Sequence, residues 1–183
     1  IQTGFILSLQ TTTESVLENI KRTNMDVNDI SEIAKYGRKL QLPIFTEIIM
    51  GLPGETVDSW KLTIEKVLES NLHNGIDSFF LQILENAPMM QDLEKYNIKT
   101  FPAYDLFYET ADVADDNKIL EGINVIESTS TLSNNELLEM FLYTWQVLGF
   151  HVYGISDIMS IYLKKQYNIS YTEFYSKLFE YNK

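Results

Sequence analysis

The chain has 183 residues, of which 45% are hydrophobic and 22% charged, so it can bury a globular core. Its formal net charge of −12 argues against nonspecific binding to nucleic acid or anionic membranes, because both need a basic face. It contains no cysteine, which excludes disulfides, thiolate zinc sites and cysteine-ligated iron–sulfur clusters from this chain. No apolar stretch approaches the roughly 20 residues needed to span a bilayer. Because a signal peptide is not apparent either, we expect a cytoplasmic protein without membrane contact.

The first hundred residues alternate strand and helix patterns. Apolar runs rich in β-branched and aromatic residues predict strands at 5–9, 43–50 and 76–84. Between them, apolar residues at helical spacing predict three helices, one after a capping box at 11–14, one from about residue 28, and one after the Gly-Pro turn. The strand centres lie roughly 35–38 residues apart, which suits right-handed crossovers in a parallel sheet.

The pattern changes beyond about residue 101. Stretches that favour β-structure at 104–108 and 123–126 flank an acidic loop at 112–116. A capping box at 133–136 predicts a long helix whose inward residues we expect to be Leu137, Leu138, Phe141, Leu142, Trp145 and Leu148. Two further helices are predicted after it. We therefore expect an α/β fold in which residues 1–100 form part of a barrel and residues 101–183 form a mixed, mainly helical C-terminal region.

Polar residues occur where each predicted strand ends, and in parallel α/β folds function collects at that edge. The first strand ends with Ser8 and Gln10, the second carries Glu47, and the third is followed by Glu85. Glu47 has two interpretations. It either faces solvent or pairs with a basic residue such as Lys21 or Arg22, or it points into the barrel mouth and binds a polar ligand.

The turn in "EIIMGLPGETVDSW", residues 47–60, also has two interpretations. Gly51 and Gly54 permit positive φ or a close approach of the backbone, and the helix that follows leaves N–H groups free at its start. The turn is therefore either a plain strand–turn–helix junction or a backbone shaped to hold a ligand.

Two segments, "SLQTTTESVLENIKR" and "TEIIMGLPGETVDSW", resemble the fourth and fifth strand–helix units of radical S-adenosylmethionine (SAM) enzymes. The similarity is greatest to the subgroup that often begins with a cobalamin-binding domain, and "IDSFFLQILENAPM" resembles that subgroup's sixth strand. The resemblance covers roughly residues 4–100. It implies that this chain is a piece of a longer enzyme, the part of a (β/α) radical SAM-type barrel from about the fourth to the sixth strand.

The resemblance implies specific cofactors. Family members hold a [4Fe–4S] cluster with three cysteines in a CxxxCxxC loop and cleave SAM to a 5′-deoxyadenosyl radical. This chain has no cysteine, so the cluster would be held elsewhere in the parent protein, the fragment alone would be inactive, and cobalamin would bind an upstream domain. By position, the SAM-contacting residues would be Ser8, Gln10, Glu47, Ile48, Ile49, Gly51, Leu84 and Glu85. The family often has glycine where Glu47 stands.

Two alternatives stay open. The chain could be a non-catalytic binding or interaction module with a barrel-like fold, or a hydrolase or transferase that uses Glu47 and Glu85 as paired acid and base. His73 is interpreted as a surface residue of a loop and His151 as a residue near a helix end, so no histidine metal site is expected. The predicted first strand would leave one edge unpaired, so we expect a second copy of the chain or its own C-terminal segment to cover that edge.

Overall fold

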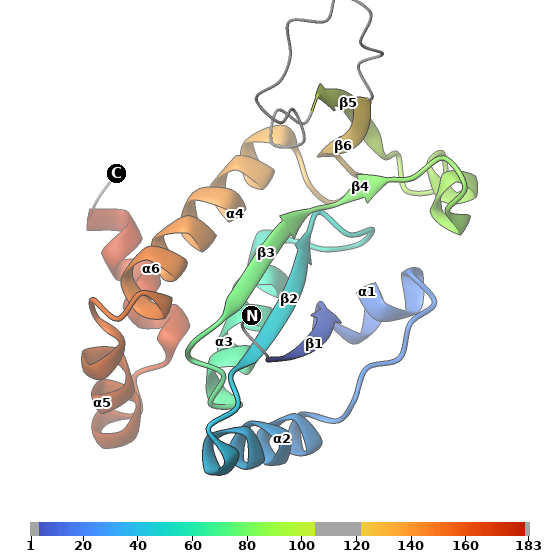
Figure 1. Ribbon diagram of the computed structural model, residues 1–183. Helices are drawn as coiled ribbons and strands as arrows, with labels where there is room; N and C mark the ends of the chain where they lie inside the picture. The colour runs from blue at the N-terminus through green and yellow to red at the C-terminus, as the bar shows by residue number, and fades with distance from the viewer. Residues whose placement is uncertain (1–3, 105–121, 182–183) are drawn as a thin grey trace, which may run out of the picture.

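A computed structural model of the chain describes residues 4–104 and 122–181. Of the stretch predicted to favour β-structure at 104–108, the structure describes only residue 104, and the acidic loop at 112–116 lies outside the described residues. Three strands, β1 (Phe5–Gln10), β2 (Ile44–Met50) and β3 (Ile76–Phe80), form a parallel sheet in the order β1-β2-β3 (Figure 1). The mixed α/β class and the parallel sheet are therefore confirmed, whereas three strands do not by themselves close a barrel.

The crossovers are the predicted helices α1 (Glu14–Asn19) and α2 (Val27–Leu40), which follow β1, and α3 (Val57–Glu69), which follows β2. A capping box between Thr56 and Ser59 starts α3. Apolar residues at helical spacing predict that Val57, Trp60, Ile64, Val67 and Leu68 form the inward face of α3, and all of them are buried except Val57, which is half-buried. They pack against alternate residues of the sheet, including Leu9 and Ile48.

The third strand is shorter than predicted, because the chain leaves the parallel sheet at Leu81. The Leu81 amide donates to the carbonyl of Met50 at 2.8 Å, while its own carbonyl accepts from the amide of Ile126 at 3.0 Å. This one residue thus joins the two sheets. The next strand, β4 (Gln82–Ile83), pairs antiparallel with β6 (Gly122–Ser128), which pairs in turn with β5 (Lys99–Tyr104), so the second sheet has the order β4-β6-β5.

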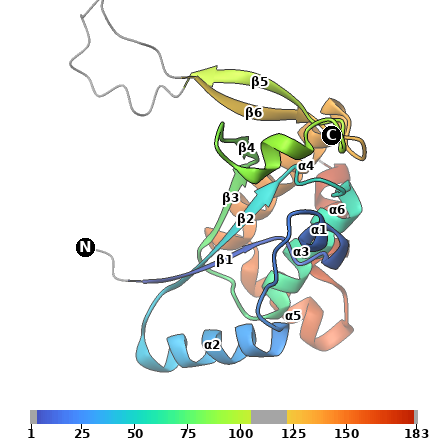
Figure 2. The same ribbon diagram turned by 90° about the vertical axis from the view of Figure 1, so that its right-hand side faces the viewer.

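The remaining elements are helical. A 3₁₀ helix, η1 (Pro88–Asp92), follows β4, and after β6 come α4 (Asn134–Val147), the π-helix η2 (Leu148–Val152), α5 (Asp157–Tyr167) and α6 (Tyr171–Tyr181). The predicted capping box of α4 is present between Ser133 and Glu136. Figure 2 shows α3, α4 and α6 gathered on one side of the parallel sheet, with no described helix against the other side. One face of the sheet is therefore left open by the described residues.

The inward face predicted for α4 is largely wrong. Leu138, Phe141, Leu142 and Trp145 have exposed fractions of 52%, 37%, 43% and 67%, while Leu137, Met140, Tyr143, Thr144 and Val147 are buried. The helix is apolar nearly all round, so its sequence spacing does not single out one face. A buried hydrogen bond from Trp60 Nε1 to Thr144 Oγ1, 2.7 Å long, joins α3 to the face that is turned inward.

Candidate functional site

A row of three polar residues crosses the open face of the parallel sheet. Ser8 of β1 pairs in register with Glu47 of β2, and Glu47 pairs with Asp77 of β3. Ser8 Oγ donates a hydrogen bond to Glu47 Oε2 at 2.6 Å. Because side chains alternate along a strand, all three project from the face opposite to buried Ile48. The row is an exposed set of oxygen acceptors at the middle of the sheet.

The basic residues proposed as partners of Glu47 bind elsewhere. Lys21 Nζ lies 3.8 Å from a carboxylate oxygen of Asp92, and Arg22 donates to the backbone carbonyl of Ser8. The pairing interpretation of Glu47 is therefore wrong for the described residues, and its partner is the Ser8 hydroxyl. Asp77 was not singled out by sequence reasoning. The alternation in "IDSFF" was the available signal, because it places Asp77 and Phe79 on the same strand face.

The other predicted contact residues occupy different environments. The Ile48 side chain is fully buried beneath the helices, so only its backbone can face a ligand, whereas Ile49 is half-buried on the open face. Gln10 ends β1 with a positive φ of 62°, after an irregularity in the register between Ser8 and Gln10. Leu84 and Glu85 are exposed just after β4, where the Leu84 carbonyl accepts from the amide of Ala87 at 2.9 Å. The acid in register with Glu47 is Asp77, not Glu85.

Both glycines of the Gly51–Gly54 turn are required by contacts within the protein. Gly51 has φ of 86°, and a Cβ there would lie 3.0 Å from the side chain of Ile126. Gly54 has φ of 87°, and its Cβ would lie 2.5 Å from Asn19 Nδ2, which donates to the Pro53 carbonyl. The turn thus packs against β6 and α1, a structural role that would exist without any ligand.

Glu55, which follows the turn, is completely buried. Thr11 Oγ1 donates to Glu55 Oε1 at 3.1 Å, and Thr131 Oγ1 donates to the backbone carbonyl of Glu55 at 2.6 Å. Burial raises the pKa of Glu55 to about 8, and the Thr11 hydrogen bond acts in the opposite direction. The residue ties the end of β1 to the loop before α4, and sequence reasoning did not identify it.

The capping box predicted at 11–14 is wrong, because the Thr11 hydroxyl bonds to Glu55. The helix α1 has Thr13 as its N-cap residue, and that side chain makes no capping hydrogen bond. The Thr11 hydroxyl is instead used by Glu55 and by Thr63, whose Oγ1 lies 3.2 Å away. Thr11 therefore bonds to the buried Glu55 instead of capping α1, because burying the Glu55 carboxyl without this hydrogen bond would cost free energy.

Within residues 4–104 and 122–181, no group of three or more His, Asp or Glu side chains is arranged to hold a metal ion. Nor is any helix in those ranges sufficiently long and apolar to cross a membrane.

No known protein-family profile matches this chain. It is similar to the cobalamin-dependent radical SAM methyltransferase TokK of Streptomyces tokunonensis, with 29% identity over 97% of this chain. It is equally similar, at 29% identity over 97% of this chain, to the 2-(S-pantetheinyl)-carbapenam-3-carboxylate methyltransferase of Streptantibioticus cattleyicolor. The chain spans about a quarter (26%) of the length of either relative. The predicted resemblance to radical SAM enzymes of the cobalamin-associated subgroup is therefore confirmed, over nearly the whole chain.

Proposed function

We propose that this chain is the SAM-contacting part of a radical SAM enzyme, with residues 1–100 supplying about the fourth to the sixth barrel strand and residues 101–183 the C-terminal region. From the names of two relatives, we also propose that the parent protein is a cobalamin-dependent methyltransferase. The observation that carries the proposal is the row of Ser8, Glu47 and Asp77 on the sheet face that the described helices leave open. The likeness to two radical SAM methyltransferases over 97% of the chain supports it.

The chemistry of the row fits SAM. The cofactor carries a sulfonium, an ammonium group and ribose hydroxyls, which are cations or hydrogen-bond donors, and the row offers two carboxylates and a hydroxyl as acceptors. In this proposal Ser8 and Gln10 contact the ribose or the methionine part, and Glu47 and Asp77 attract the cationic groups. The backbone at Ile48, Ile49 and Gly51 and the segment at Leu84 and Glu85 would lie along the adenine.

The residues of this chain do not fit the iron–sulfur cluster. No cysteine is available among its 183 residues, so cluster ligands and cobalamin contacts would come from other parts of the parent. The contribution that we assign to this chain is to bind and orient SAM. Two neighbouring carboxylates, Glu47 and Asp77, suit that task because the charge on the ligand offsets their mutual repulsion.

The test uses the complete reading frame that contains this chain, expressed anaerobically with iron and sulfide. We expect 5′-deoxyadenosine to form from SAM, and we expect Asp77→Asn and Ser8→Ala to weaken SAM binding by about tenfold each, the size of a lost charge-assisted hydrogen bond. Asp29→Asn is the matched control, because Asp29 is exposed in the first turn of α2, away from the row. Unchanged SAM affinity in both row variants would refute the assignment of this site.

The alternative, a non-catalytic binding module with a barrel-like fold, gives a different result in the same preparation. A folded, iron-loaded protein that neither binds nor cleaves SAM would support that alternative and overturn the radical SAM proposal. For a hydrolase or transferase that uses Glu47 and Glu85 as paired acid and base, the strand register offers no support, because the acid in register with Glu47 is Asp77.

The unpaired edge of β1 is a possible contact surface for a second copy of the chain. Within the described residues, β1 pairs only with β2, so the expectation that the C-terminal segment covers this edge is wrong there. Phe5 and Ile6 have exposed fractions of 57% and 56%. We propose that the isolated 183-residue chain dimerises through this edge. Sedimentation velocity across a range of concentrations tests this, and a monomer at every concentration would refute it.

A further inference from the structure

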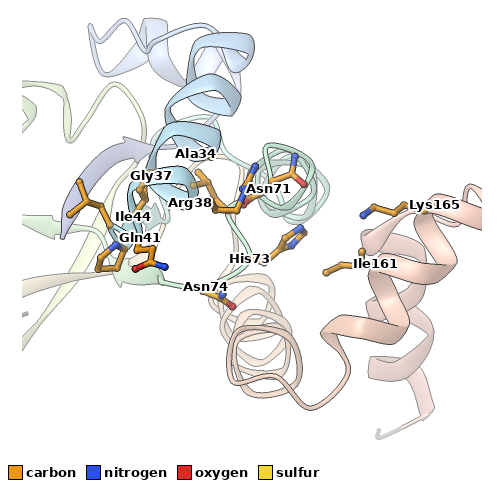
Figure 3. Close-up of a pocket in the computed structure, with 13 residues that line it drawn as sticks. Ala34, Gly37, Arg38, Gln41, Ile44, Asn71, His73, Asn74, Ile161 and Lys165 are labelled. Carbon is orange, nitrogen blue, oxygen red and sulfur yellow. The ribbon is translucent and has the colours of Figure 1, made fainter. Parts of the chain in front are cut away.

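A cavity lies at the end of the parallel sheet where strands β2 and β3 begin. It has a volume of about 530 Å³ and is bounded by the end of α2, the loop before β3 and one face of α5 (Figure 3). The polar residues that line it are Arg38, Gln41, Asn71, His73, Asn74 and Lys165. Its size falls in the range of small-molecule sites, and apolar residues such as Ile44 and Ile161 complete the wall.

The charge of this cavity is opposite to that of the chain. The protein carries a net charge of −12, yet the cavity lining includes Arg38 and Lys165 and no acidic residue. Among the described residues, neither cation has a carboxylate within ion-pair distance. Arg38 donates to the backbone carbonyl of Asn71 at 3.0 Å, which positions the guanidinium without neutralising it. Two uncompensated cations therefore face one cavity from different helices.

His73 lines the same cavity and is connected to the protein interior. Its Nδ1 lies 3.0 Å from Nε2 of His151, a residue 78 positions later that is fully buried. Nδ1 of His151 lies 2.8 Å from the Tyr175 hydroxyl, which is 3.1 Å from Ser156 Oγ. The sequence had indicated an isolated surface histidine and an isolated helix-end histidine, but the fold joins them in one hydrogen-bonded chain.

This hydrogen-bonded chain accommodates two arrangements of its protons, because the hydroxyls of Tyr175, Ser156 and Ser160 can each donate or accept. In the first arrangement Tyr175 donates to a serine and accepts from Nδ1 of His151, and Nδ1 of His73 then donates to Nε2 of His151. In the second, Tyr175 donates to Nδ1 of His151, and Nε2 of His151 donates to Nδ1 of His73. Nε2 of neutral His73 is therefore an acceptor in the first arrangement and a donor in the second.

The surroundings keep His73 in this neutral state. Burial lowers the pKa of His73, and the positive charges of Arg38 and Lys165 lower it further, while Asp157 acts in the opposite direction. The contact of His73 with His151 uses Nδ1, and among the described residues Nε2 of His73 has no hydrogen-bonding partner. The cavity therefore combines two cations with one free imidazole nitrogen.

We propose that this cavity is a binding site for a small organic anion whose carboxylate or phosphate group contacts Arg38 and Lys165, and whose neighbouring hydroxyl hydrogen-bonds to Nε2 of His73. The apolar wall would contact the carbon skeleton of the ligand. The site is separate from the row of Ser8, Glu47 and Asp77, because it lies at the beginning of the strands rather than on the open face. It does not depend on the proposed function.

Three probes test the proposal on the complete reading frame at pH 7.5: acetate, glycolate and inorganic phosphate. Glycolate differs from acetate by one hydroxyl, and phosphate supplies both charge and a donor. Binding is followed by NMR of ¹³C-labelled histidine rings, with the His73 signal assigned by its loss in His73→Gln. We expect a saturable shift of that signal, with glycolate binding several-fold tighter than acetate, and the tighter of glycolate and phosphate identifies the anion class.

Variants of the lining residues distinguish binding in this cavity from nonspecific electrostatic screening by the added anions. Arg38→Gln and Lys165→Gln should each weaken binding by about tenfold, as expected for a lost charge-assisted contact. Lys39→Gln, which removes an exposed charge from the same helix but does not line the cavity, should leave binding unchanged. Shifts that rise linearly without saturation, or equal weakening in all three variants, would overturn the proposal. Equal affinity for acetate and glycolate would overturn the role of His73.

Discussion

Thr11 at the end of β1 donates a hydrogen bond of 3.1 Å to the buried carboxyl of Glu55, which lies 44 positions later at the start of the segment leading into α3. The contact joins two crossovers of the parallel sheet through a group that is uncharged in the folded protein at neutral pH, because burial raises its pKa to about 8. Stability at this position therefore depends on pH.

Glu55→Gln should remove one component of that dependence. The folded chain holds a proton on Glu55 between pH 4.5 and about 8, where the unfolded carboxyl has lost it, so the free energy of unfolding falls as pH rises through this window. The slope approaches about 1.4 kcal/mol per pH unit. Urea unfolding between pH 6.5 and 9 should show a flatter profile for Glu55→Gln than for the wild type. Glu32→Gln, an exposed carboxyl on α2, should follow the wild type, and parallel profiles for Glu55→Gln would refute the assignment.

His151 should make the free energy of unfolding depend on pH with the opposite sign, at lower pH. Burial and, to a smaller extent, the neighbouring His73 lower its pKa from 6.5 to about 4, while Asp157 acts in the opposite direction. Between these values the unfolded chain binds the proton and the folded chain does not, so stability is lost as pH falls from 6.5 towards 4. Comparing Glu55→Gln with Glu55→Gln/His151→Gln isolates this effect, since Glu55 otherwise opposes it in the same window. The double variant should lose less stability on acidification, and an unchanged slope would contradict the prediction.

Gly54→Ala should destabilise the turn that precedes α3. The residue has φ of 87°, and a methyl group would lie 2.5 Å from the Asn19 amide nitrogen. We expect a loss of about 1–3 kcal/mol, from backbone strain and displacement of Asn19. Gly149→Ala is the control, because nothing lies within 4 Å of the Cβ position there, and it should change stability by less than about 0.5 kcal/mol. Equal effects in thermal unfolding would show that the turn tolerates a side chain.

The two tryptophans should behave differently. Trp60 is fully buried and bonded to Thr144, whereas Trp145 has an exposed fraction of 67%. Trp60→Ala should cost about 3–5 kcal/mol, the value typical of a large core truncation, and Trp145→Ala less than about 0.5 kcal/mol. In the wild type, iodide should quench the fluorescence of Trp145 and not that of Trp60. A stability loss of equal size in Trp145→Ala would show that the originally predicted inward face of α4 is buried in solution.

Local sequence patterns were sufficient for most individual elements of the fold. Strands β1 and β2, the buried face of α3 and the capping box of α4 follow from residue type and spacing over a few turns. The break at Leu81 could not be predicted in this way. Its apolar run continues from residue 76 to 84, and only the competing hydrogen bonds of Met50 and Ile126 divide it between two sheets. The sequence also named Ser8 and Glu47, but their neighbour Asp77 depends on strand register, which is a tertiary property.

Composition and local spacing determined that this protein is an acidic, cysteine-free α/β chain with polar groups at its strand ends, and the resemblance of three of its segments indicated part of a radical SAM enzyme. Tertiary structure alone decided which face of α4 is buried, that Thr11 serves Glu55 rather than a helix cap, and that His73 meets His151. The reason is physical. Patterns along the chain report interactions within about one helical turn or one strand, whereas the energy of burying a polar group depends on partners brought together from distant segments.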